Sequence, residues 1–147
     1  MTICTYNART LASEAAVEDL MMQARKIMYD VIGLTETRRR HHLNAVNESG
    51  KELFLGTCDS RGVGGVGVLV NASMAKNIDS FEQLTTRIGR LRIGRCGPTP
   101  ALNIFVAYAP TSSYEEEKGV EASYMDLEKY FRKDYASYNH NWPKKNA

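Results

Sequence analysis

The first 35 residues carry the pattern that most restricts what this chain can fold into. Residues 2–6 alternate between polar and apolar types, which predicts a short strand. Apolar residues then recur at helical spacing from Ala16 to Met28, and Ser13 before them is suited to be the N-cap of a helix. Residues 30–34 predict a buried strand. Strand, helix and strand in so short a stretch indicate a βαβ unit, and therefore a mixed α/β (α+β) chain.

The rest of the chain is richer in predicted strands than in helices. A basic run, Arg38–His42, leads into what reads as a polar loop. Strand patterns follow at 53–55, 66–70, 79–85, 88–95 and 101–108, and Pro110 ends the last of them. Ser113 and Glu116 form a capping box that predicts a helix to about Tyr135, with Leu127 and Phe131 on its buried face.

The composition is that of a globular protein with one domain. Hydrophobic residues make up 43% of the 147 residues and charged residues 24%, which argues against disorder of the whole chain. The formal net charge is only +2, so any nucleic-acid site must come from local clustering.

The cysteines and the hydropathy pattern indicate the compartment. Cys4, Cys58 and Cys96 are widely spaced and include no C-x-x-C pair, as expected for free thiols in a reducing environment. The sequence has no signal-peptide pattern and no apolar run of about 18 residues. We therefore expect an intracellular protein, nuclear or cytoplasmic, that is not secreted and has no membrane partner.

Four motifs occur at or near the ends of predicted strands. They are Thr5–Arg9, Asp30–Arg38, Gly65–Val70 and Ala107–Thr111. In their order and spacing they resemble the opening motifs of the endonuclease/exonuclease/phosphatase superfamily. In that pattern an asparagine ends the first strand and a glutamate ends the second. The resemblance covers residues 2 to about 138 and is closest to the N-terminal half of non-LTR retrotransposon endonucleases.

This resemblance implies a fold and a reaction. The fold would be the N-terminal half of a two-sheet β-sandwich flanked by helices, with the active site at one end of the sandwich. Residues 1–138 would form this partial domain and 139–147 an unstructured tail. The reaction would be hydrolysis of a phosphodiester that depends on Mg²⁺ (or Mn²⁺), and the partner would be DNA, which such enzymes nick.

The resemblance also assigns roles to individual residues. Glu36 would be the metal ligand, Asn7 would help to hold the metal or the phosphate, and Tyr108 would donate its hydroxyl to the scissile phosphate. Oxygen ligands suit Mg²⁺, and an amide offers both donors and an acceptor. Each residue also has a simpler interpretation: an exposed glutamate, a turn asparagine and a core tyrosine.

Four arginines are candidates for DNA phosphate contacts. Arg38, Arg39 and Arg40 follow the glutamate motif, and Arg61 lies in the glycine-rich turn. A run of charges is more often a solvated surface, and this interpretation stays open. His41 and His42 match no catalytic position of the family and are expected to be loop residues.

Two later motifs of the family, Gly-Asp-x-Asn and Ser-Asp-His, do not occur in this sequence. Because their side chains activate the attacking water, we expect the chain to be truncated and catalytically impaired. Half a sandwich would also leave the inner sheet face bare, which predicts marginal stability or self-association through that face.

Three alternatives remain. The chain could be a non-catalytic remnant that binds nucleic acid or protein, or a translated copy without selected function. A lipid phosphodiesterase of the same superfamily would need a lipid-facing apolar loop, and the sequence shows none.

Overall fold

The structure is a computed structural model that describes residues 1–94, 100–109 and 125–132. The chain divides into two compact units, Met1–Tyr108 and Ala109–Ala147. The first unit contains the two sheets, and in the second the described residues 125–132 are helical. The expected domain boundary at 138 and the tail 139–147 lie outside the described residues. No helix within the described ranges is long and apolar enough to cross a membrane.

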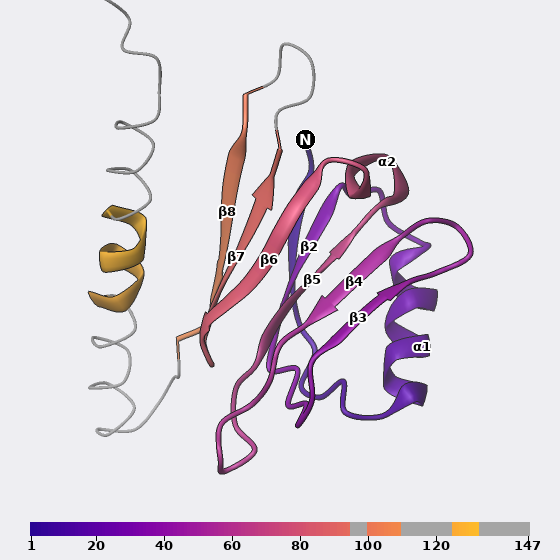
Figure 1. The fold of residues 1–147 in the computed structure, drawn as a ribbon. Helices are drawn as coiled ribbons and strands as arrows, with labels where there is room; N and C mark the ends of the chain where they lie inside the picture. The colour runs from indigo at the N-terminus through magenta and orange to yellow at the C-terminus, as the bar shows by residue number, and fades with distance from the viewer. Residues whose placement is uncertain (95–99, 110–124, 133–147) are drawn as a thin grey trace, which may run out of the picture. The chain divides into compact units, whose positions relative to one another are not determined.

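The first unit is a mixed α/β structure with two sheets (Figure 1). The five-stranded sheet has the order β1 (Ile3–Asn7), β2 (Val31–Thr35), β5 (Val66–Val70), β4 (Glu52–Leu55) and β3 (Leu43–Val46). The three-stranded antiparallel sheet has the order β6 (Ile78–Thr85), β7 (Ile88–Ile93) and β8 (Leu102–Ala107). The described helices of this unit are α1 (Glu14–Ala24) and α2 (Ala72–Ala75).

The predicted βαβ unit is confirmed. Strands β1 and β2 pair in parallel, and α1 connects them. The helix begins where the sequence indicates, because the Ser13 hydroxyl accepts a hydrogen bond from the Ala16 amide at 3.1 Å. Leu20 and Ala24 of α1 join Leu34 and other residues in one apolar cluster. The helix thus covers one face of the five-stranded sheet (Figure 1).

The helix ends earlier than its apolar pattern predicts. The pattern continues to Ile27 and Met28, but α1 stops at Ala24 and the chain turns there. Ile27 is 48% and Met28 91% exposed. The extension of the helix to these two residues, which the spacing predicts, is therefore wrong, because the chain must turn after Ala24 to bring Val31 into register with β1.

The second sheet packs on the other face of the five-stranded sheet. Val68 of β5, Leu91 of β7 and Val106 of β8 belong to one buried cluster, and every residue of β5 is buried. The prediction that the inner face is bare is wrong for the centre of the sheet, since the three-stranded sheet covers it. Self-association remains a prediction, and it would need a different apolar surface.

The remaining elements agree with the sequence patterns in part. The strands near 53–55, 66–70, 79–85, 88–95 and 101–108 are present as β4 to β8. Strand β3, in contrast, occupies part of the stretch predicted to be a polar loop. The capping box at 113–116 lies outside the described residues. In the helical residues 125–132, Leu127 is half-buried but Phe131 is 59% exposed, so its predicted burial is wrong.

Candidate functional site

The predicted site residues lie at the strand ends that meet at one end of the two sheets. Because β1 and β2 are parallel, Asn7 at the end of β1 lies beside Thr35 at the end of β2, and Glu36 comes next. Tyr108 directly follows β8. In Figure 1 this is the lower end of the first unit, where the β4–β5 loop and the β6–β7 turn also lie.

A hydrogen bond joins the two sheets at this end. The Tyr108 hydroxyl donates to the Glu36 carboxylate at 2.6 Å, although 72 residues separate the two along the chain. This bond to the carboxylate, followed by burial and the negative charge of Glu36, raises the pKa of Tyr108. The positive charges of Arg87 and Arg38 act on the pKa in the opposite direction. Both arginines are therefore close enough to influence the hydroxyl.

The backbone around Glu36 adopts a conformation that side chains other than glycine rarely take. Arg9, Glu36 and Arg38 have φ values of 60°, 55° and 53°. Such residues cost about 1–3 kcal/mol each, and they persist only where neighbouring structure holds them. The neighbours are backbone groups of the glycine-rich turn: the Thr37 amide donates to the Gly65 carbonyl at 3.2 Å. The strain is concentrated at the candidate site.

Two glycines allow this arrangement because they bring the turn before β5 close to the Glu36 segment. The Arg38 amide donates to the Gly64 carbonyl at 3.0 Å. Gly65 has a φ of +95°, and a Cβ there would lie 2.3 Å from the Thr37 hydroxyl oxygen. Any larger residue at 65 would push the Thr37–Arg38 segment away.

Asn7 is positioned by its own turn. Its side-chain oxygen accepts a hydrogen bond from the Arg9 amide at 3.0 Å, and its side chain is exposed. Within the described residues no hydrogen bond joins Asn7 to Glu36. The structure therefore places Asn7 at the strand end next to Glu36, with a different hydrogen-bond partner.

The donor set determines what metal this end could hold. Among the described residues, no three or more His, Cys, Asp or Glu side chains lie close enough together to hold a metal ion. One carboxylate from Glu36 and one amide oxygen from Asn7 are a smaller set of donors. Mg²⁺ keeps several waters and takes one or two protein oxygens together with substrate phosphate. Glu36 and Asn7 thus offer oxygen donors of the type that a hydrated Mg²⁺ takes.

The predicted DNA-contacting arginines have different environments. Arg38 is exposed, and its charge acts on Tyr108. Arg39 is half-buried, because its guanidinium donates to the carbonyls of Leu11 at 2.8 Å and His41 at 3.3 Å. Arg61 lies in the β4–β5 loop with its side chain 74% exposed, and it pairs with Asp59 at 3.3 Å. Arg38 and Arg61 are thus exposed to a ligand, whereas Arg39 also connects its own loop to the segment that contains Leu11.

The sequence patterns miss Arg87. This residue lies in the β6–β7 turn, where its carbonyl accepts a hydrogen bond from the Tyr108 amide at 2.9 Å. The neighbouring Thr86 carbonyl accepts a hydrogen bond from the Gly65 amide at 2.7 Å, and this bond joins the β6–β7 turn to the glycine-rich turn before β5. No local signal could identify Arg87, because its importance arises only from pairing between distant strands.

The chain was also compared with known proteins. No family model matches it, and no curated protein matches it in sequence.

Proposed function

We propose that this chain is a Mg²⁺-dependent phosphodiester-binding domain of the DNA endonuclease type, as carried by non-LTR retrotransposons, and that its catalysis is impaired. The observation that carries the proposal is the 2.6 Å hydrogen bond between Tyr108 and Glu36. The sequence resemblance assigns these two residues to one active site, and they meet although they belong to different sheets.

The surroundings of this pair support a ligand role over a purely structural one. Glu36 stands on a left-handed backbone, and so does Arg38. A structural hydrogen bond between two sheets needs no such strain, whereas strained residues cluster at binding and catalytic sites. Tyr108 offers a hydroxyl donor that could turn from the carboxylate to a phosphate oxygen.

The charge at this end suits a phosphate. Arg9, Arg38 and Arg87 come from three different loops at this end, and the charges of Arg38 and Arg87 act on Tyr108, the partner of Glu36. A bound Mg²⁺ would add charge that stabilises the developing negative charge on the phosphate. The protein's own groups would orient the ligand: Glu36 and Asn7 on the metal side, and Tyr108 and the arginines on the phosphate oxygens.

Hydrolysis needs a further group that activates water. The resemblance implies that Gly-Asp-x-Asn and Ser-Asp-His motifs supply it, and these 147 residues contain neither. General-base catalysis alone typically contributes about 10²–10⁴-fold to a rate. We therefore propose that the chain binds DNA phosphates but nicks DNA little or not at all.

Binding and nicking can be measured on the same preparation. We expect a labelled DNA duplex to bind more tightly in Mg²⁺ than in EDTA, with an affinity that falls as salt rises. Glu36→Gln should remove the Mg²⁺ dependence, whereas Glu48→Gln, in the exposed β3–β4 turn, should retain it. Supercoiled plasmid should stay intact with the wild type and equally with Glu36→Ala.

Two results would change the proposal in different ways. Equal affinity in Mg²⁺ and EDTA, unaffected by Glu36→Gln, would contradict a metal site and leave a non-catalytic nucleic-acid-binding module. Nicking that requires both Mg²⁺ and Glu36 would show that the chain is an active nuclease and would contradict the impaired catalysis.

A further inference from the structure

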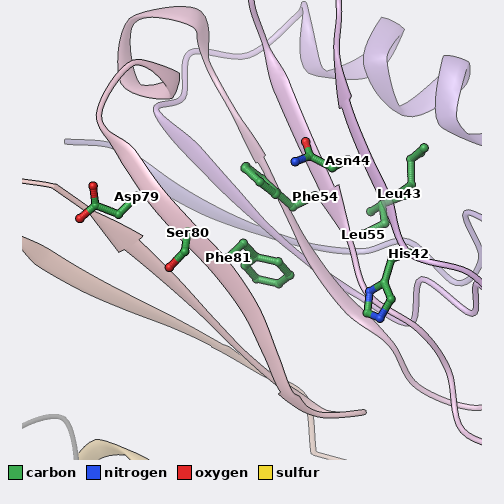
Figure 2. Close-up of a pocket in the computed structure, with 8 residues that line it drawn as sticks. All are labelled: His42, Leu43, Asn44, Phe54, Leu55, Asp79, Ser80 and Phe81. Carbon is green, nitrogen blue, oxygen red and sulfur yellow. The ribbon is translucent and has the colours of Figure 1, made fainter.

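A pocket lies on the side of the first unit, between β3–β4 of the large sheet and β6 of the small sheet (Figure 2). Its volume is about 340 Å³. It is lined by His42, Leu43, Asn44, Phe54, Leu55, Asp79, Ser80 and Phe81. It exists because β6 packs near the centre of the large sheet and leaves the outer strand β3 exposed on that side: Asn44, Ala45 and Val46 are all exposed.

Aromatic rings form the inner wall of this pocket. The Phe54 and Phe81 ring centroids are 5.9 Å apart with an interplanar angle of 42°. Both side chains are only partly buried, and in Figure 2 they project into the space between their strands. Partly exposed rings are stacking platforms for planar groups, and each stacked base contributes substantially to affinity in single-stranded nucleic-acid binding.

Polar side chains surround the rings and are free to bind a ligand. Among the residues that the structure describes, His42, Asn44, Asp79 and Ser80 form no side-chain hydrogen bond. Asn44 pairs with Phe54 across β3 and β4, so its amide lies beside a ring on the same sheet face (Figure 2). An amide can both donate and accept along the edge of a purine base.

The charge outside the pocket points to a nucleotide and not to an apolar ligand. The basic run 38–40 leads directly to His42 at one end of the pocket. The Arg40 guanidinium extends towards Gly62, since a Cβ at Gly62 would lie 3.5 Å from it. Arg61 is therefore near the same basic surface. Phosphates held there would leave the attached base at the His42 end of the pocket.

We infer that this pocket binds an unpaired purine base, with Phe54 and Phe81 stacking on it and Asn44 reading its edge. The inference rests on the proposed function, because it adds a base site beside the phosphate-binding end. The same chemistry could come from a nucleic-acid strand or from a free nucleotide.

The test uses 2-aminopurine, whose fluorescence changes on stacking, with the full chain. It is offered as the nucleoside, as the 5′-monophosphate and within a single-stranded oligonucleotide. We expect a saturable emission change that weakens about tenfold in Phe81→Leu and also in Asn44→Ala. Met22→Leu changes an exposed residue of α1 that does not line the pocket, and it should retain the emission change. Because Asn44 is exposed, its variant keeps the fold even if Phe81→Leu loses stability.

The three probes identify the source of the base. Tighter binding of the oligonucleotide than of the monophosphate assigns the pocket to a nucleic-acid strand, and equal binding assigns it to a free nucleotide. No emission change with any probe, or a change that both pocket variants retain in full, would overturn the inference. Glu36→Gln in the same assay distinguishes the two proposals, because it should abolish Mg²⁺-dependent binding and leave the stacking of the nucleoside unchanged.

Discussion

The two ends of the five-stranded sheet use polar side chains in different ways. At the α2 end, Asp30 accepts a hydrogen bond from the Thr2 amide at 2.6 Å, and the Asn71 amide donates to the Tyr29 carbonyl at 2.7 Å. Each of these hydrogen bonds joins a side chain to a backbone group. At the Glu36 end, the carboxylate meets a side chain from the other sheet, on a left-handed backbone.

We interpret this difference as one between a structural role at the α2 end and the proposed ligand-binding role at the Glu36 end. Polar side chains that are hydrogen-bonded to backbone groups stabilise the fold and have less capacity left to bind a ligand. Groups held in strained positions by their surroundings cost stability and persist where they bind something. We therefore expect changes at the α2 end to affect folding alone and changes at the Glu36 end to affect ligand binding.

The largest effect on stability should come from Gly65→Ala, compared with Gly50→Ala. Both glycines have positive φ values, +95° and +86°. At Gly65 the new Cβ would also meet the Thr37 hydroxyl at 2.3 Å, whereas at Gly50 the nearest atom is the Ala72 Cβ at 3.3 Å. We expect Gly65→Ala to lower the free energy of unfolding by about 3 kcal/mol and Gly50→Ala by about 1 kcal/mol. Urea denaturation measures both, and equal losses would contradict the tight packing at the Glu36 end.

A smaller loss should follow from Asn71→Ala. Its amide donates to Tyr29 and Asp30, and its oxygen accepts from the Met74 amide at 2.9 Å as the N-cap of α2. We expect a loss of about 2 kcal/mol in unfolding free energy, with Mg²⁺-dependent DNA binding unchanged. The stability control is Asn44→Ala, which should leave the free energy of unfolding unchanged. The Asn44 side chain is exposed and forms no hydrogen bond within the described residues. If DNA binding by Asn71→Ala no longer depended on Mg²⁺, the α2 end would not have a purely structural role.

Tyr108→Phe should have a modest effect on stability and a clearer one on binding. The variant removes one hydrogen bond to a partly exposed carboxylate, which costs about 1 kcal/mol. DNA binding in Mg²⁺ should weaken as well, because the phosphate loses a donor. Tyr6→Phe changes an exposed tyrosine on β1 and should leave both properties intact. If the two variants bind DNA equally, Tyr108 has only a structural role.

The smallest expected effect is a pH dependence from Asp30. The hydrogen bond from the Thr2 amide lowers the pKa of this carboxyl. Burial raises the pKa, but the hydrogen bond from Asn71 and the charge of the N-terminus lower it further. A lowered pKa in the folded state contributes stability above the unfolded pKa, and this contribution is lost as pH falls through the folded pKa. As pH falls below about pH 4, the free energy of unfolding should therefore decline more steeply in the wild type than its other carboxyls alone would cause. In Asp30→Asn this component should disappear, and an identical acid profile would contradict the assignment.

Much of the fold follows from local patterns in the sequence. Some patterns predict an element from neighbouring residues alone, and the structure contains those elements. They are the alternation in residues 2–6, the Ser13 cap and the apolar run 66–70. Strand β3 is missed because Asn44, Ala45 and Val46 are exposed and show no alternation. Met28 is misassigned because helical spacing continues after the helix has turned away.

The candidate site is predictable only in part. Glu36 and Tyr108 can be anticipated, because each ends a strand and the ordered motifs suggest a common site. The left-handed conformations of Arg9, Glu36 and Arg38 leave no trace in the sequence, since these residue types usually avoid them. Local patterns also do not show which distant segments pair. The position of Arg87 beside Tyr108 and the hydrogen bond from Arg39 to the Leu11 carbonyl both depend on that pairing.

The most direct test of the account is a count of bound Mn²⁺, the paramagnetic substitute for Mg²⁺, by electron paramagnetic resonance of the folded chain with a short DNA duplex. The account predicts one Mn²⁺ site in the wild type, its loss in Glu36→Gln and its retention in Glu48→Gln. The same Mn²⁺ binding in all three proteins, or none in any of them, would contradict the claim that the Glu36 end of the sheets is a metal and phosphate site.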